Sequence, residues 1–224
     1  MEVLGKGVYE YGECAHLLGI ARGRVRGWFH GYPNRPDALI HSDYEGAFDT
    51  PVVSFLDFVD AAVALTLTAK HDVSVQMVRK LRRRLSEELA TVHPFARKDF
   101  YVLPASRPIV FSGDAKTDGD MRLVEVLKGQ RAFPELMLPF LSKVEYDETT
   151  KLAQVFPLIG RVILDPRRKY GKPIVRGTGM PTILLYECYK ACASEDVVAD
   201  WYNVSTEDVI EAVRFETEFS GIAA

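Results

Sequence analysis

The sequence predicts an α+β protein with helices at both ends and short strands between them. Two apolar-patterned helical segments joined at a glycine lie within residues 9–30. After Pro94 the pattern changes to short β-branched and aromatic runs that are bounded by Pro, Gly and Asp. From Thr182 onward, serines precede segments of helical periodicity, which is typical of capped helices. We expect three parts: an N-terminal domain (1–98), a central region with short strands (99–159) and a C-terminal three-helix domain (160–224).

The N-terminal segments match the spacing of a helix-turn-helix. Such a unit needs a small residue at the helix crossing, a glycine in the turn and a branched residue that seats the second helix. Ala15, Gly19 and Val25 meet these needs at separations of four and six residues. Four further apolar residues occupy the remaining core positions: Cys14, Leu18, Ile20 and Trp28. A plain helical hairpin without DNA-binding function remains the alternative.

The second helix, predicted over about residues 21–29, carries the candidate DNA-reading side chains. We expect an outward face of two arginines and two glycines, with a third arginine at the flank: Arg22, Gly23, Arg26, Gly27 and Arg24. Arginine can donate two hydrogen bonds to guanine in the major groove. Each glycine costs about 1 kcal/mol of helix stability relative to alanine. On a DNA-facing surface, however, it lets the backbone approach phosphates or base edges.

Two further helices are predicted before the strands begin. Ser54 and Asp57 form a capping box. It opens a helix with one buried stripe, formed by Phe55, Phe58, Val59, Ala62 and Val63. Ser74 caps the next helix, which ends before Pro94 and whose basic residues we expect to point away from its apolar face. Arg79 and Arg83 of that basic run are candidate phosphate contacts, and a solvated helix face is the alternative.

The remaining elements are predicted from shorter signals. We expect strands at 100–102, 109–111, 143–146 and 152–156, the last two joined by a turn at 147–150. One helix is expected around 121–128. At the C-terminus, helices are expected over 182–192, from Ser194 to about Trp201, and from Ser205 to about Phe219.

Charge is distributed unevenly, although the formal net charge is only −3. Residues 79–98 hold seven basic and two acidic side chains, and residues 161–176 hold six basic ones and one aspartate. Residues 195–218 hold eight acidic side chains and one arginine. Two basic zones and an acidic tail predict more than one binding surface, with ordinary solvated faces as the alternative.

The front of the chain resembles a MerR-like DNA-binding module. The resemblance rests on residues 9–28, Gly31-Tyr32, residues 54–57 and residues 73–80. It implies DNA binding by the helix-turn-helix. No long heptad-patterned helix follows, so the coiled-coil dimer typical of MerR activators is not expected.

The C-terminal part resembles a small antitoxin domain of bacterial toxin–antitoxin operons. The resemblance rests on Asp165-Pro166, Gly171-Lys172-Pro173 and Arg176-Gly177-Thr178, which precede the three helices. Together with the front module, the whole chain resembles the longer VapB-type antitoxins. The resemblance implies a PIN-like ribonuclease toxin as partner, with a carboxylate cluster that binds Mg²⁺ or Mn²⁺.

Basic side chains in and around these C-terminal motifs are the candidate toxin contacts, because they could dock on those carboxylates. They are Arg167, Arg168, Lys169, Lys172 and Arg176. Gly177 and Gly179 suggest positive φ angles or close backbone packing. A structural turn linker is the alternative interpretation of this segment.

Catalytic, metal and cofactor sites are not expected. Asp114, Asp118 and Asp120 lack the spacing of a calcium loop, and the five histidines lack metal-ligand spacing. The three cysteines form no C-x-x-C motif, and burial is the simplest role for Cys188 and Cys192. No signal peptide or membrane-length apolar segment is present, so we expect a cytoplasmic protein.

The sequence thus predicts a non-enzymatic antitoxin that represses its own operon and works as a homodimer on palindromic promoter DNA. One alternative is a stand-alone transcription regulator whose C-terminal half senses a ligand or protein. Another is an interaction scaffold without a DNA role.

Overall fold

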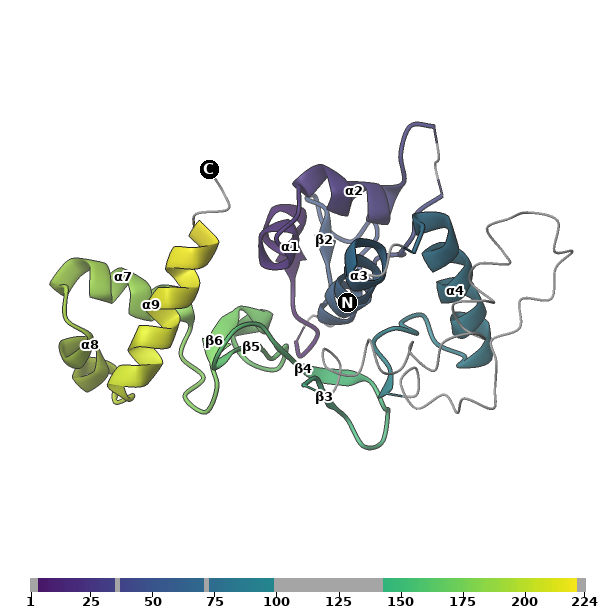
Figure 1. Ribbon diagram of the computed structural model, residues 1–224. Helices are drawn as coiled ribbons and strands as arrows, with labels where there is room; N and C mark the ends of the chain where they lie inside the picture. Colours follow the sequence, from purple (N-terminus) through teal and green to yellow (C-terminus); the bar gives the residue numbers. More distant parts are fainter. Residues whose placement is uncertain (1–3, 35–36, 71–72, 99–142, 221–224) are drawn as a thin grey trace, which may run out of the picture.

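The protein is a mixture of helices and small antiparallel sheets, as the sequence predicts (Figure 1). The computed structural model describes residues 4–34, 37–70, 73–98 and 143–220. The strands predicted at 100–102 and 109–111, the helix around 121–128 and the Asp114–Asp120 cluster lie outside these described residues. No described helix has the length and apolar character needed to cross a membrane.

Two short helices form the predicted N-terminal hairpin. Strand β1 (Tyr9–Glu10) leads into α1 (Tyr11–Leu18), and α2 (Arg22–His30) follows after a tight turn. Gly19 ends α1 in the left-handed conformation, with φ +63° and ψ +37°. Its amide donates to the His16 carbonyl, and the Ile20 amide donates to the Ala15 carbonyl. The predicted core residues Cys14, Ala15, Val25 and Trp28 are buried, and Leu18 and Ile20 pack partly buried against them.

Helix α3 (Phe55–Lys70) follows β2 (Val52–Val53), which pairs antiparallel with β1. The capping box is confirmed: the Asp57 amide donates to Ser54 Oγ, and the Ser54 amide donates to an Asp57 carboxylate oxygen. The buried face of α3 is wider than the single stripe that the sequence predicts. Asp57, Asp60, Ala61 and Ala64 are also buried, because α1, α4 and β4 all contact this helix.

Helix α4 (Val75–Glu88) begins at the predicted cap, where Ser74 Oγ accepts a hydrogen bond from the Met77 amide. Val78, Leu81 and Leu85 are buried on its apolar face. The prediction that every basic residue of this helix points away from that face is wrong for Arg82. Its side chain is buried and forms an ion pair with Asp60 of α3.

A four-stranded antiparallel sheet connects the two ends of the chain. Its order is β3 (Glu145–Tyr146), β4 (Ala153–Pro157), β5 (Val162–Leu164) and β6 (Pro173–Val175). The predicted turn joins β3 to β4, and Asp147 Oδ1 accepts hydrogen bonds from the Thr149 and Thr150 amides. Residues 162–164 and 173–175, which the sequence analysis did not predict as strands, pair across the short 3₁₀ helix η2 (Lys169–Gly171).

Three helices complete the chain: α7 (Thr182–Cys192), α8 (Glu195–Tyr202) and α9 (Thr206–Ser220). Ser194 Oγ and Ser205 Oγ cap α8 and α9, as predicted. Gly177 and Gly179 have φ angles of +87° and +69°, also as predicted. All three cysteines are free; Cys14 is buried, whereas Cys188 and Cys192 are only half-buried.

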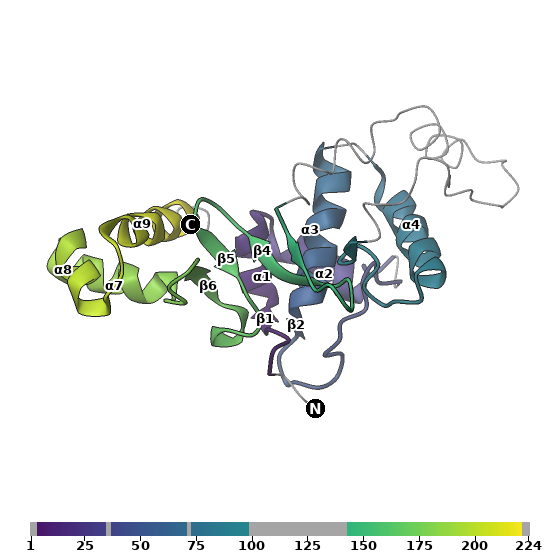
Figure 2. The same ribbon diagram turned by 90° about the horizontal axis from the view of Figure 1, so that it is seen from below.

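The sheet lies between α1–α4 and α7–α9 in both views (Figures 1 and 2). Phe156 of β4 packs edge-on against Phe58 of α3, with ring centroids 5.3 Å apart, and Phe215 of α9 joins the same core. A second core lies among α7, α8, α9 and β6, around Val175, Leu185 and Val209. The expected domain boundary near residue 160 falls between the paired strands β4 and β5, so the sheet crosses it.

The segment around η2 is fixed to the N-terminal module. Tyr9 Oη donates to the Gly171 carbonyl at 2.8 Å, and the Val8 amide donates to the Tyr170 carbonyl at 3.1 Å. Lys172 Nζ pairs with Glu13 of α1 at 2.6 Å. These contacts join residues near the predicted DNA-reading hairpin to residues about 160 positions later in the chain.

Replacing Gly171 by alanine should destabilise the protein more than the matched change at Gly177. The two glycines have φ angles of +81° and +87°, so each substitution carries the left-handed penalty of about 1–2 kcal/mol. At Gly171 the new Cβ would also lie 2.3 Å from the oxygen of the buried Tyr9 and 3.2 Å from Gly7 Cα, whereas Gly177 has nothing within 4 Å. Urea unfolding measures the difference, and equal losses for the two variants would contradict this packing.

Candidate functional site

The exposed face of α2 carries three of the predicted DNA-binding residues. Arg22, Gly23 and Arg26 are exposed. Arg24 is half-buried: its Nη2 donates to Thr68 Oγ1 of α3 at 3.0 Å, and its guanidinium lies 5.1 Å from the Trp28 ring centroid. Arg24 therefore attaches α2 to α3, while Arg22 and Arg26 remain available to a partner.

The prediction that Gly27 faces outward is wrong. Gly27 is buried, because the Tyr32 ring covers it. A Cβ at this position would lie 2.0 Å from Tyr32 Cζ, whereas a Cβ at Gly23 would have nothing within 4 Å. The absence of a side chain at Gly27 thus makes room for an aromatic ring of the following loop.

The two arginines predicted to contact phosphates differ in their surroundings. Arg79 is half-buried, and its Nη2 donates to the Asp37 carbonyl at 3.0 Å. Arg83 is exposed on α4. Arg82, which lies between them in the sequence, is buried against α3. Of the two candidates, Arg83 is the more accessible to a phosphate.

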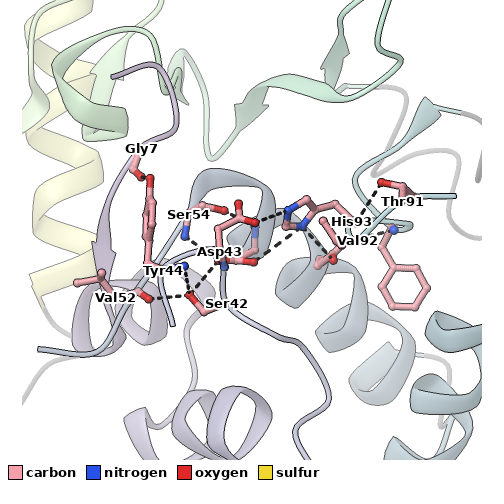
Figure 3. Close-up of polar contacts among 12 residues, drawn as sticks. Gly7, Ser42, Asp43, Tyr44, Val52, Ser54, Thr91, Val92 and His93 are labelled. Atoms are coloured by element: carbon pink, nitrogen blue, oxygen red, sulfur yellow. Dashed lines mark hydrogen bonds and ion pairs between the residues drawn. The ribbon is translucent and has the colours of Figure 1, made fainter. Parts of the chain in front are cut away.

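A largely buried cluster of acids and cations lies in the N-terminal module, and the sequence analysis missed it (Figure 3). His93 Nε2 lies 3.0 Å from Asp43 Oδ1, and His93 Nδ1 lies 3.5 Å from Asp60 Oδ2 and 3.8 Å from Asp57 Oδ1. Arg82 Nη2 lies 3.2 Å from Asp60 Oδ2. Asp57 and Asp60 are fully buried, and His93 is 4% exposed. The available signal was two acids three residues apart in an otherwise apolar helix.

Electrostatics in this cluster favour a protonated His93. Burial by itself lowers the pKa of His93, but hydrogen bonds to Asp43 and Asp60 outweigh it and raise the pKa to about 10. Burial raises the pKa of Asp57 to about 6, against hydrogen bonds that favour the carboxylate. Burial also opposes ionisation of Asp43, yet the hydrogen bond from His93 holds its pKa below the usual value.

Asp43, Asp57 and His93 could in principle hold a metal ion, since their ligand atoms lie within 4.8 Å of one another. A metal would have to displace the His93 proton, which the neighbouring carboxylates stabilise. Arg82 already supplies a second positive charge at Asp60. The donor set therefore fits a cluster of internal ion pairs better than a metal centre.

A cavity of about 420 Å³ lies beside the cluster. Its walls come from the start of α3, the segment at His93 and the sheet, and they include Lys6, Ser54, His93, Gln154 and Arg167. A small molecule bound there would contact both the N-terminal module and the sheet.

Most of the basic side chains predicted to contact a toxin are paired within the chain. Asp165 is buried and accepts two hydrogen bonds from the Arg167 guanidinium, at 2.9 and 3.0 Å, and lies 3.6 Å from Arg168. The other two pairs are Lys172 with Glu13 and Arg176 with Glu145. Lys169 is exposed and forms no ion pair among the described residues. The segment is therefore less basic at its surface than its composition suggests.

Of three comparisons with known proteins, one matches the C-terminal part of the chain and two extend over most of it. A family model described as "Protein of unknown function (DUF433)" matches residues 162–215, from β5 into α9. A Mycobacterium tuberculosis (strain ATCC 25618 / H37Rv) protein named "Putative antitoxin VapB45" is 26% identical in a 221-residue alignment that covers 92% of this chain and 92% of that protein. A crystal structure of Rv2018 from Mycobacterium tuberculosis has a TM-score of 0.70 at 22% identity, covers 92% of this chain and 96% of that one, and shows a shared fold.

Replacing Gly23 by alanine should stabilise the protein, by up to about 1 kcal/mol, because the new methyl group enters open space in a helix. Gly27→Ala should give a smaller gain or a loss, because the Tyr32 ring must move away. Thermal unfolding of the two variants measures this contrast. In a Tyr32→Ala background the two substitutions should become similar; a persistent difference there would show that Tyr32 is not the cause.

The stability of the protein should fall as the pH rises from about 7 toward 10. The folded-state pKa of His93, about 10, lies above its ordinary value of 6.5, so this contribution is complete below pH 6.5 and is lost as His93 deprotonates. The free energy of unfolding should fall by at most about 1.4 kcal/mol for each pH unit. Urea unfolding across this range should show a flatter profile for His93→Gln than for the unmodified chain. Parallel profiles would contradict a protonated His93.

Proposed function

We propose that this chain is an antitoxin that binds and inhibits a cognate PIN-like ribonuclease toxin and represses its own operon by binding promoter DNA. One observation carries this proposal: the similarity to a protein named as an antitoxin extends over 92% of both chains rather than over one shared domain. The same arrangement of parts, including the 162–215 segment matched by the DUF433 family, would then serve the same type of task.

In this proposal α2 reads promoter DNA. Arg22 and Arg26 lie exposed on one face of the helix, beside the open position at Gly23. Arginines so placed can reach guanine edges, and Arg83 on α4 can add a phosphate contact. One such helix reads one half-site, so a homodimer would bind half-sites about 34 Å apart, or a multiple of that distance. A promoter-binding role implies a cytoplasmic protein.

The toxin-binding role falls to the C-terminal half and involves no chemistry by this chain. Arg167 and Arg168 keep about half of their side-chain surface exposed despite their pairing with Asp165. A carboxylate cluster in a nuclease active site could compete with Asp165 for these two guanidinium groups. Lys169 forms no ion pair among the described residues, so it could bind such a carboxylate without first leaving another partner. The chain would therefore act by occupying the toxin, without a cofactor or metal of its own.

A stand-alone transcription regulator is the second candidate, favoured by the cavity beside His93. A ligand in this cavity would contact the cap of α3 at Ser54 and Arg167 of the sheet region at once. Such a regulator would bind promoter DNA but would leave a ribonuclease unaffected.

The decisive experiment combines the purified chain with the product of the neighbouring reading frame and an RNA substrate. We expect the product by itself to cleave RNA, and we expect this cleavage to stop when an equimolar amount of the chain is added. Alanine at all five candidate positions (Arg167, Arg168, Lys169, Lys172 and Arg176) should weaken inhibition. Unchanged cleavage in the presence of the unmodified chain would contradict the antitoxin function and favour the stand-alone regulator.

The DNA-binding role makes a separate prediction about salt. In a plot of the logarithm of the affinity for the upstream DNA against the logarithm of the salt concentration, the slope should be about −0.9 for each phosphate contact. Arg22→Ala and Arg26→Ala should each weaken binding about fivefold or more, since a good arginine–guanine pair contributes about 1–3 kcal/mol. Lys190→Ala on the remote helix α7 is the matched control and should bind normally. Equal binding by all three variants would contradict the assignment of α2.

A further inference from the structure

Half of the large apolar side chains that are exposed among the described residues lie on the C-terminal helices. Among the described residues, α7, α8 and α9 carry five of them: Ile183, Leu184, Val197, Trp201 and Ile210. Exposed apolar surface of this kind is typical of a binding site, and tryptophan is enriched where the binding energy concentrates. The basic segment at 167–176 is therefore not the only surface that a partner could use.

Helix α8 has two distinct faces. Val198 and Ala199 are buried between α7 and α9, whereas Val197 and Trp201, one turn apart, are 38% and 63% exposed. Residues four apart lie on the same side of a helix, so Val197 and Trp201 form one apolar strip. Helix α8 also lies at the end of the molecule opposite α4 in both views (Figures 1 and 2). No other described element covers this strip.

An acidic border runs beside the apolar strip. Asp196 and Asp200 follow the same four-residue spacing on the neighbouring row of α8, and both are exposed. Residues 191–213 contain six acidic side chains and no lysine or arginine. Asp200, Glu195 and Glu207 form no ion pairs among the described residues. This face would repel nucleic acid and would attract a basic surface.

We propose that the exposed face of α8, formed by Val197 and Trp201 beside Asp196 and Asp200, is the main docking element for the partner protein. The occupant is a protein groove with an apolar floor for the Trp201 ring and a rim of lysine or arginine for the two aspartates. This inference rests on the proposed antitoxin function and names the toxin as that partner. In this proposal the principal contact with the toxin is made by the acidic and apolar face of α8, and not by the internally paired basic segment at 167–176.

The test is a titration of the full-length chain with the product of the neighbouring reading frame. Trp201→Ala should weaken binding about tenfold or more, as expected for a central aromatic contact. Asp200→Lys should weaken it as well and should reduce its dependence on salt. Val92→Ala and Glu88→Lys are matched controls, since both residues are exposed in the N-terminal module, and both variants should bind within about twofold of the unmodified chain.

The outcomes separate this inference from the antitoxin proposal itself. If the unmodified chain binds the product while the Trp201 and Asp200 variants bind equally well, the α8 face is not the docking element and the antitoxin function stands. If the unmodified chain does not bind the product, both proposals fail. If sedimentation of the chain alone shows a dimer that Trp201→Ala converts to a monomer, a second copy covers this face and the inference is overturned. Thermal unfolding should be unchanged in the variants, because Trp201 is largely exposed.

Discussion

The ion pairs around the buried Asp60 connect separate segments of the N-terminal module. The members of this cluster come from four places: Asp60 from α3, Arg82 from α4, His93 from the segment after α4, and Asp43 from the loop before β2. Asp60 Oδ1 also accepts the Phe95 amide, which places the Phe95 ring in the core. Removing one member of such a cluster leaves an uncompensated buried charge, which costs about 3–5 kcal/mol. Because α3 supports both α1 and, through Arg24, α2, the geometry of the proposed DNA-reading hairpin depends on these charges.

Local signals made much of the fold predictable. The Ser54–Asp57 capping box, the Ser205 cap, the left-handed Gly19 and the Asp147 turn each involve groups within a few residues of one another, so the sequence alone reveals them. The strands β5 and β6 were missed because each has only three residues and the pattern of Pro and Gly around them is also typical of turns. The burial of α3 on nearly all sides depends on partners that arrive from β4, about 90 residues later, which no local pattern contains.

The candidate site was predictable only in part, for the same reason. The exposure of Arg22 and Arg26 follows from helical periodicity, whereas the cover over Gly27 depends on the path of the loop at Tyr32. Local composition made residues 167–176 look strongly basic, but Lys172 meets Glu13 from a helix 159 residues earlier and Arg176 meets Glu145 from another strand. Conversely, the acids of α8 were visible in the sequence as part of an acidic tail, while the exposure of Trp201 beside them becomes visible only once the helix faces are known.

In this proposal one chain carries two separate partner surfaces, α2 for promoter DNA and the C-terminal half for a toxin. Light scattering on an equimolar mixture of the chain, the product of the neighbouring reading frame and upstream DNA tests it most directly. We expect a single species whose mass includes all three components. A mixture in which the chain associates with neither the DNA nor the product would contradict it.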